Sequence, residues 1–286
     1  MSFQFRKLYA DVLSADGSLC VVYLSWAKLL GRWYGRSGVE LYAADGTRTV
    51  YPGGDVAVVE RSELDATRIV VSLPKGQLVL QYEPEHEGFS PPSPAECPSL
   101  SWSVLVPRGR ARISSPDVGD REGVGYVDWV TLSRPTRLLR FRELMWGRAH
   151  VADTTVAFTS LELTDGHAWR TGAVWTRPSR AGVPAGDVMA QLDDAGVGRV
   201  KVGDAAATLR AERVLHEGDA FGPDRLSKAI DRLVVRAVAG PTHETRWVGA
   251  ARIGDDEGRA VFERVRFGAA ASESLAPRFR PPAIGE

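Results

Sequence analysis

Short stretches of alternating apolar and polar residues, separated by turn signals, run through most of this chain. In residues 19–26, for example, Cys20, Val22 and Leu24 fall on one face of an extended strand and Tyr23 falls on the other. A period of two residues is typical of β-strands, because successive side chains of a strand point to opposite sides. The chain is therefore predicted to consist mainly of β-strands.

Three Asp-Gly pairs mark hairpin turns: Asp16-Gly17, Asp45-Gly46 and Asp165-Gly166. This dipeptide is favoured in tight hairpins, where the central residues take positive φ. A further turn is predicted at residues 74–76. The predicted strands are 8–13, 19–26, 39–43, 47–51, 69–73, 77–82, 100–106, 126–132, 156–163, 167–175, 199–202, 206–211, 243–253 and 259–267.

The regular spacing of these strands predicts an all-β fold of sandwiches or up-and-down barrels. The length of 286 residues fits two domains better than one. We therefore predict two tandem antiparallel β-barrel domains, residues 1–140 and 141–286, with few short helices. Residues 187–194 are predicted to form one such helix, and residues 224–235 fit helix or strand. Residues 83–98 are predicted to form a long loop and residues 269–286 an extended or disordered tail.

The balance of charge argues against nucleic acid as a partner, because Lys plus Arg and Asp plus Glu both number 36. The two cysteines, Cys20 and Cys97, make no disulfide framework, although one bridge stays open. We find no apolar stretch of signal-peptide or membrane-span length, and expect a cytoplasmic protein with reduced thiols. Oligomeric state is left open.

Metal, phosphate-loop and nucleophile-elbow signals are not found in the sequence. The five histidines lack the spacing of metal ligands, no glycine-rich loop joins a strand to a helix, and residues 35–39 lack the second glycine of an elbow. We therefore expect neither a metal nor a cofactor.

Two segments resemble the carotenoid 1,2-hydratase group. Residues 7–12, with the following Asp16-Gly17 turn and residues 21–26, are similar to the group's opening Trp-Tyr-x-Asp strand and hairpin, with Leu8 at the place of the tryptophan. Residues 123–129 and 144–150 resemble its Gly-Tyr-His-Asp-His-Asn-Trp-Gly stretch and the Trp-Gly-Arg at the start of its second domain.

The resemblance implies a fold, a ligand class and a choice of reactions. The group contains carotenoid hydratases, tocopherol cyclases and decalin-forming Diels–Alderases, which hold long apolar polyenes between two lipocalin-like barrels without a metal or redox cofactor. Here Val127 and Trp129 stand where the hydratases carry histidines, which weakens proton-initiated chemistry. A cyclisation that depends on holding the substrate in a reactive geometry does not require these histidines.

We therefore expect a cofactor-free cyclase of the Diels–Alder type, acting on an apolar polyketide or terpenoid intermediate in bacterial natural-product biosynthesis. One alternative is a carotenoid or terpenoid hydratase, or a proton-initiated cyclase, with Asp128 as the acid. The other is a lipocalin-like carrier that binds an apolar ligand without changing it.

The candidate catalytic residues are Asp128, Tyr126 and Glu143. Asp128 and Tyr126 alternate along one predicted strand, so they share a face. A carboxyl group beside a phenol in an apolar pocket can stay protonated or polarise a carbonyl. A structural hydrogen bond that closes the end of the barrel is an equal alternative.

The candidate substrate-binding residues are largely aromatic or charged, and the ligand is expected between the barrels. Arg148 is expected either to pair with Asp11 or Asp128 or to grip an acidic oxygen of a substrate. For the aromatic residues, ordinary barrel core is the commoner explanation. The set comprises Tyr9, Asp11, Tyr23, Trp26, Trp33, Trp129, Trp146, Arg148 and His150.

Overall fold

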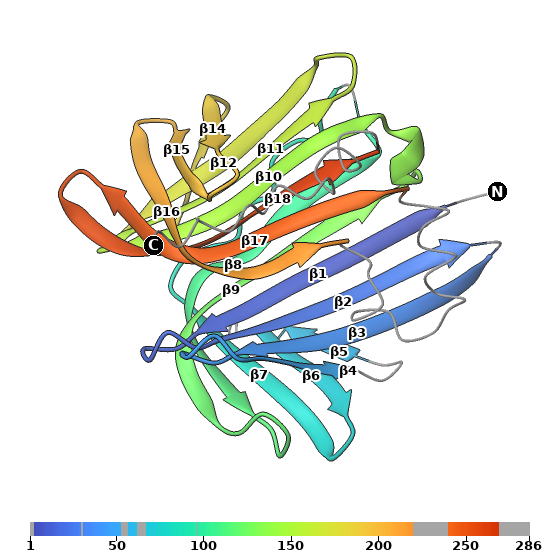
Figure 1. Cartoon of the computed structure of the whole chain (residues 1–286), viewed down its shortest axis with the longest axis vertical. Coiled ribbons are helices and arrows are strands. Elements are labelled where there is room, and N and C mark those ends of the chain that lie inside the picture. The colour runs from blue at the N-terminus through green and yellow to red at the C-terminus, as the bar shows by residue number, and fades with distance from the viewer. Residues whose placement is uncertain are drawn as a thin grey trace, which may run out of the picture.

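The computed structural model describes residues 3–29, 31–52, 57–61, 67–95, 97–219 and 240–268. The expectations for residues 224–235 and 269–286 lie outside these ranges. Within them the chain forms two nine-stranded antiparallel sheets (Figure 1).

The first sheet contains the N-terminal strands, in the order β4-β3-β2-β1-β9-β8-β7-β6-β5. Its strands are β1 (Gln4–Leu13), β2 (Leu19–Leu29), β3 (Arg32–Tyr42), β4 (Arg48–Pro52), β5 (Ala57–Arg61), β6 (Thr67–Leu73), β7 (Gly76–Pro84), β8 (Leu100–Ser114) and β9 (Arg121–Leu132).

The second sheet repeats this order as β13-β12-β11-β10-β18-β17-β16-β15-β14. Its strands are β10 (Phe141–Val151), β11 (Thr154–Leu163), β12 (Ala168–Thr176), β13 (Val183–Ala185), β14 (Val188–Leu192), β15 (Val197–Val202), β16 (Ala205–Gly218), β17 (Thr242–Ile253) and β18 (Asp256–Phe267).

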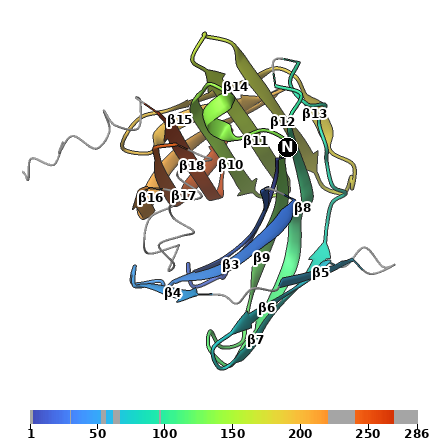
Figure 2. The same ribbon diagram turned by 90° about the vertical axis from the view of Figure 1, so that its right-hand side faces the viewer.

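Both sheets curl into barrel-like units that lie against each other (Figures 1 and 2). The all-β prediction is confirmed, and the helix of the described chain is a single 3-10 turn, η1 (Thr136–Leu138). This turn lies in the connection between the sheets, where the domain boundary was proposed.

The predicted helix at residues 187–194 is wrong. The segment forms β14, which pairs with β15 in a hairpin. Val188 and Leu192 are buried while the intervening Met189 and Gln191 are exposed, so a period of two suits the burial better than a helical period. The turn that follows is fixed by Asp193, whose Oδ1 accepts hydrogen bonds from two backbone amides.

The Asp-Gly turns are confirmed, in a form that differs from the expected one. Gly17, Gly46 and Gly166 take positive φ, whereas the preceding aspartates do not. Each aspartate instead accepts a hydrogen bond from the backbone amide two residues later, at 2.9 Å for Asp16. The side chain therefore stabilises the turn, and only the glycine needs the left-handed conformation.

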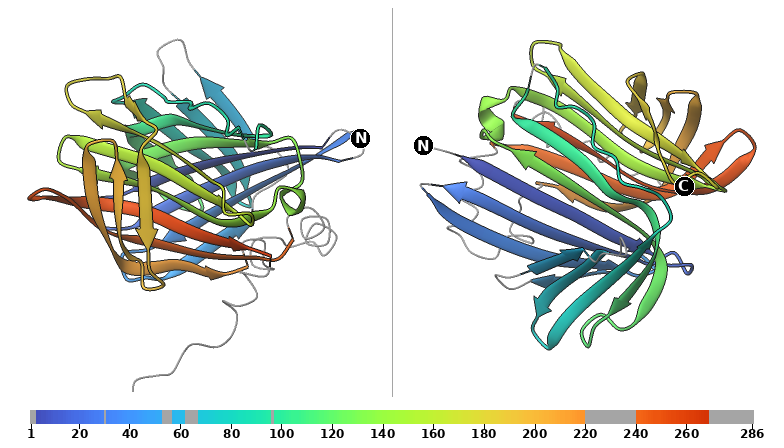
Figure 3. Two further views of the ribbon diagram at one scale, coloured as in Figure 1. Left: turned by 90° about the horizontal axis from the view of Figure 1, so that it is seen from above. Right: turned by 180° about the vertical axis from the view of Figure 1, so that it is seen from behind.

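The loop after β7 ties the two sheets together (Figure 3). The carbonyl of Glu87 accepts a hydrogen bond from Trp175 Nε1 at 3.1 Å, and the Glu87 amide donates to the Arg180 carbonyl at 2.8 Å. The long loop predicted at residues 83–98 is confirmed from residue 85 onward in the described residues, whereas residues 83 and 84 still belong to β7.

The described residues form four clusters of buried apolar side chains, and three of them define the two barrels and the space between them. On β1, Leu8, Ala10 and Val12 point into the first barrel, whereas Tyr9 and Leu13 point toward the second sheet. The second barrel has its own core, with Phe158, Trp247 and Phe262 among its buried members. The core between the two sheets, which we call the inter-sheet layer, therefore has side chains of both sheets.

The two cysteines, Cys20 and Cys97, are buried and free. Among the described residues, no helix is long and apolar enough to cross a membrane.

Candidate functional site between the sheets

The inter-sheet layer holds a fully buried ion pair. Arg148, on β10, donates from Nε to Asp11 Oδ2 at 3.1 Å and from Nη2 to Asp11 Oδ1 at 2.5 Å. Neither side chain has any exposed surface. Of the two partners considered for Arg148, the structure therefore selects Asp11, and the pair joins the central strands of the two sheets.

Tyr9 completes this pair on the first-sheet side. Its hydroxyl donates to Asp11 Oδ2 at 2.8 Å. Burial raises the pKa of Tyr9 well above its usual value, and the Asp11 carboxylate raises it further. Tyr9 is therefore a neutral phenol throughout the physiological pH range.

A second carboxyl group, that of Asp128, lies in the same layer on β9. Its Oδ2 accepts hydrogen bonds from Trp102 Nε1 at 3.0 Å and from the Tyr126 hydroxyl at 3.1 Å. The shared face of Tyr126 and Asp128 is thus confirmed. Burial raises the pKa of Asp128 to about 7, although the two donors and Lys7 oppose the shift. Asp128 therefore exchanges between acid and carboxylate near neutral pH.

Aromatic rings pack around these polar groups. The centroid of the Trp146 ring lies 4.9 Å from that of the Tyr9 ring and 5.5 Å from that of the Tyr126 ring, and both contacts are edge to face. Tyr23 lies 5.5 Å from Tyr9 in the same type of contact. Rings in these orientations present both faces and edges to whatever lies between the sheets.

A third polar cluster was not predicted. Arg246, on β17, donates to Glu263 from Nε at 2.9 Å and also pairs with Glu244. Its guanidinium group lies over the rings of Tyr23, at 5.0 Å, and Tyr9, at 5.7 Å. The available signal was the alternation of Glu244 and Arg246 along a predicted strand, which places two opposite charges on one face.

Two buried arginines keep unused donors in this layer. Nη1 of Arg148 and Nη1 of Arg246 have no hydrogen-bond partner among the described residues, and both side chains are fully buried. A buried N–H group without a partner is unfavourable. These two groups could therefore hold an oxygen atom of a ligand.

A cleft of about 920 Å³ opens at one end of the layer. Leu13, His150 and Val248 line it. Asp11, Arg148 and Arg246, three of the charged residues of the layer, each lie two residues before one of these lining residues and on the same face of its strand. The cleft therefore leads toward the buried polar network.

Trp26 and Trp129 do not belong to the layer. They pack against the core of the first barrel, with their rings 5.6 Å apart. The expectation that Trp26 lines an inter-barrel site was wrong, because Trp26 lies an odd number of residues from Tyr23 and therefore faces the opposite side of β2. The Trp33 side chain lies outside the described part of the structure.

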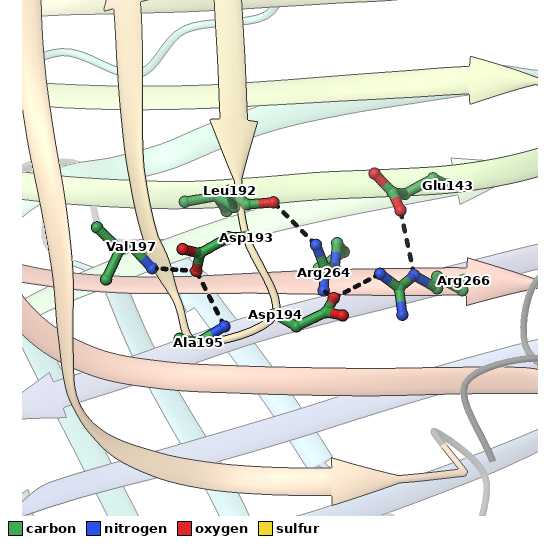
Figure 4. A network of polar contacts seen from close by, with 8 residues as sticks. All are labelled: Glu143, Leu192, Asp193, Asp194, Ala195, Val197, Arg264 and Arg266. Atoms are coloured by element: carbon green, nitrogen blue, oxygen red, sulfur yellow. Dashed lines mark hydrogen bonds and ion pairs between the residues drawn. The ribbon is translucent and has the colours of Figure 1, made fainter. Parts of the chain in front are cut away.

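Glu143 lies in a separate network on β10 (Figure 4). Its Oε2 accepts from Arg266 Nε at 3.4 Å, and Arg266 in turn donates to Asp194 at 2.7 Å. Arg264 pairs with the same Asp194 and donates to the Leu192 carbonyl at 2.8 Å. This network ties the β14–β15 turn to β18, so the structure gives Glu143 contacts that hold the second barrel together.

The comparisons with known proteins bear on the fold. No protein-family model matches the chain, and no curated protein matches its sequence. Among solved structures, the chain is similar to CghA in complex with Sch210972, with a TM-score of 0.61 and 13% identity over 93% of this chain and 89% of CghA. The fold is that of the group suggested by the sequence.

Two other solved structures share this fold. A Nitrosomonas europaea protein assigned as an AttH candidate gives a TM-score of 0.57 at 13% identity, over 92% of each chain. Kievitone hydratase from Nectria haematococca gives 0.51 at 7% identity, over 93% of this chain and 89% of that enzyme. At these identities the likeness establishes the two-barrel, lipocalin-like architecture.

Proposed function

We propose that this protein is a cofactor-free cyclase that folds an apolar substrate in the inter-sheet layer and catalyses a Diels–Alder-type ring closure. The observation that carries this proposal is the Asp128 carboxyl group, which is buried among aromatic rings with its pKa raised to about 7. A substantial fraction of Asp128 is therefore protonated at neutral pH.

A protonated carboxyl group can donate a hydrogen bond to a carbonyl oxygen of the substrate. Such a bond draws electron density from a conjugated alkene, which makes it a better dienophile, and it is strongest where water is excluded. Trp102 and Tyr126 hold the carboxyl group in place. Asp128 would then be the catalytic hydrogen-bond donor, with Trp102 and Tyr126 as its positioning residues.

The aromatic walls would supply the second part of the rate enhancement. Holding two reacting ends in near-attack geometry lowers the barrier by roughly 7–11 kcal/mol at best. Trp146 makes edge-to-face contacts with Tyr9 and Tyr126, whose own rings are tilted relative to each other with their centroids 6.3 Å apart. A polyketide or terpenoid polyene, with its flat unsaturated segments, suits such walls.

A proton-initiated cyclase or hydratase with Asp128 as the acid is the second candidate. Val127 and Trp129, which stand where the hydratases carry histidines, pack into the first barrel. Because they face away from Asp128, their identity does not weaken an acid in the inter-sheet layer.

The experiment incubates linear polyketide or terpenoid polyenes that carry a conjugated carbonyl, with and without the protein, and follows them by mass spectrometry and NMR in D2O. We expect faster cyclisation, altered stereochemistry and no deuterium in new C–H bonds. If the protein changes neither the rate nor the stereochemistry, the proposal that it is a cyclase is contradicted. Deuterium bound to carbon in the product would favour the proton-initiated cyclase or hydratase.

Two substitutions of Asp128 separate the same mechanisms. Asp128→Asn keeps an N–H donor and should retain part of the activity of a hydrogen-bonding catalyst, whereas Asp128→Leu should lose it. If Asp128 transfers a proton to carbon, both variants should be inactive. Trp26→Phe, in the first barrel, is the matched control and should retain full activity.

A further inference from the structure

The cleft at the end of the inter-sheet layer is rich in arginine. Its walls come from the β1–β2 turn, the start of β9 and parts of β8, β16 and β18. The charged residues that line it are Asp16, Arg108, Arg110, Glu122, Glu212, Arg213 and Arg259.

Each carboxylate of the cleft wall already has a partner. Glu122 pairs with Arg110 at 3.0 Å, and Glu212 pairs with Arg259 at 2.5 Å. Asp16 accepts hydrogen bonds from the backbone and side chain of Ser18. The wall carboxylates therefore need no cation from a ligand.

Arg213 differs from the other arginines of the wall. Its described hydrogen bonds go to backbone carbonyls of two first-sheet turns, including that of Gly17 at 3.2 Å, and none goes to a carboxylate. The Nε atom of Arg213 is buried and has no partner among the described residues. Carbonyls do not neutralise the guanidinium, and Asp45, the carboxylate that interacts with it electrostatically, is exposed to solvent and makes no hydrogen bond to it among the described contacts, so this wall favours an anion.

His150 lies at the floor of the same cleft. The side chain is 8% exposed, and its Nδ1 lies 3.3 Å from Thr155 Oγ1. Its Nε2 has no partner among the described residues. A buried imidazole nitrogen that lines a cavity without a partner is available to a ligand.

Arg148, Arg108 and Arg259 lie around His150, and each also pairs with a carboxylate, namely Asp11, Glu85 and Glu212 in turn. Burial holds the pKa of His150 well below its usual value, and the nearby Arg148, Arg108 and His86 lower it further. Arg259 is its register partner on β18. Because these three arginines are paired, the group that is available to an anion at this point of the cleft, among the described residues, is the unpartnered Nε2 of His150, and Arg213 on the facing wall supplies the charge.

We propose that this cleft binds the acidic oxygen group of an amphipathic substrate, a carboxylate or an enolate, through Nε2 of His150 and the guanidinium group of Arg213. The proposal rests on the proposed function in one respect, namely that the apolar part of the same molecule extends into the inter-sheet layer. The substrate class is thus an organic acid with a long unsaturated chain.

The test compares decanoate with 1-decanol, which share a chain and differ in charge. Their affinities for the full chain are measured by calorimetry, below the critical micelle concentration of decanoate and below the aqueous solubility of 1-decanol. We expect decanoate to bind about tenfold more tightly or better, as a charge-assisted contact in a recess allows. Equal affinities would overturn the proposal.

Substitutions at His150 identify the nitrogen that matters. His150→Gln places an amide nitrogen near the position of Nε2, whereas His150→Asn keeps the contact with Thr155 and leaves the Nε2 position empty. We expect the preference for decanoate to persist in the first variant and to fall toward unity in the second and in Arg213→Gln. A preference that is unchanged in both His150→Asn and Arg213→Gln would refute the site.

Arg170→Gln is the matched control. Arg170 is an exposed arginine paired with Glu162 at 3.7 Å, and it does not line the cleft. Its loss should leave the preference unchanged. If the protein prefers decanoate but does not cyclise the linear substrate, the proposed function is refuted and the anion subsite is supported. If it cyclises the substrate but does not prefer decanoate, the subsite is refuted and the proposed function is supported.

Discussion

The interior of the second barrel and the inter-sheet layer are both buried, but they are built from different chemistry. The barrel interior contains Phe158, Trp247 and Phe262 packed against aliphatic side chains, which are valines, leucines and alanines. The layer instead buries charged groups: Asp11, Asp128, Arg148, Glu244, Arg246 and Glu263. Buried ion pairs are weak evidence for stability, because desolvation of the charges offsets their attraction.

This difference in chemistry indicates that the barrel interiors stabilise the fold, whereas the inter-sheet layer is suited to binding and catalysis. Apolar burial stabilises the barrels at roughly 25 cal/mol per Å² of apolar surface removed from water. The layer contributes less stability per group but keeps directed donors and acceptors in a water-excluded space, which is what binding and catalysis need. The following substitutions should therefore affect the two regions in different ways.

The largest expected effect is the loss of one partner of the buried ion pair. Arg148→Met leaves Asp11 charged and unpaired in the layer, which costs about 3–5 kcal/mol of the free energy of unfolding. Urea denaturation measures this loss. The double variant Asp11→Leu, Arg148→Met should recover most of it. A loss below about 1 kcal/mol in the single variant would show that the pair is not desolvated.

Asp128 should make stability depend on pH in a predictable direction. Its pKa is raised from 3.8 to about 7 in the folded protein, so folding favours the protonated form. The stability that this neutral group contributes is complete below pH 3.8, declines as the pH rises, and is lost above about 7. Over that range the change is on the order of 4 kcal/mol.

Asp128→Asn isolates this effect, since the amide stays neutral at every pH. The free energy of unfolding of the variant, minus that of the native protein, should be higher at pH 9 than at pH 4, by about 2–4 kcal/mol. Paired urea titrations at the two pH values measure the gain. A difference that is independent of pH would show that Asp128 does not titrate in the folded state.

A smaller effect is expected inside the second barrel. At Gly147 an added Cβ would lie 2.8 Å from Phe262 Cβ and 2.9 Å from ring atoms of Phe158. Gly147→Ala should therefore lower the free energy of unfolding by about 1–3 kcal/mol through overpacking. The preference for decanoate should not change, because the contacts lie on the barrel side of β10. A changed preference would mean that the two regions are coupled.

The alternation of residues predicted much of the fold and part of the site. It placed Tyr126 on the same face as Asp128, and it placed Tyr23 and Leu24 on opposite faces, because the two faces of a strand can be assigned from one sequence. It could not choose between Asp11 and Asp128 as the partner of Arg148, since that depends on how two sheets face each other.

The Arg246 cluster and the cleft needed the tertiary structure for the same reason. Arg246 meets Glu263 only because β17 pairs with β18 in one register. The cleft brings together side chains from strands as distant in sequence as β1 and β18. The wrong helix prediction at residues 187–194 has a different cause. The apolar residues of so short a segment fit the period of a helix and that of a strand, and tertiary packing decides between the two.

The central claim is that the ligand occupies the inter-sheet layer and not a barrel interior, and the eight tryptophans can test it. Trp102 and Trp146 belong to the layer, Trp247 lies inside the second barrel, and Trp26 packs into the first. We would label the protein with 5-fluorotryptophan, assign each ¹⁹F resonance by single Trp→Phe substitutions, and titrate decanoate. The account predicts that the Trp146 and Trp102 resonances shift with saturation while those of Trp247 and Trp26 stay in place. Shifts confined to Trp26 or Trp247, with Trp146 unmoved, would place the ligand inside a barrel and contradict the account.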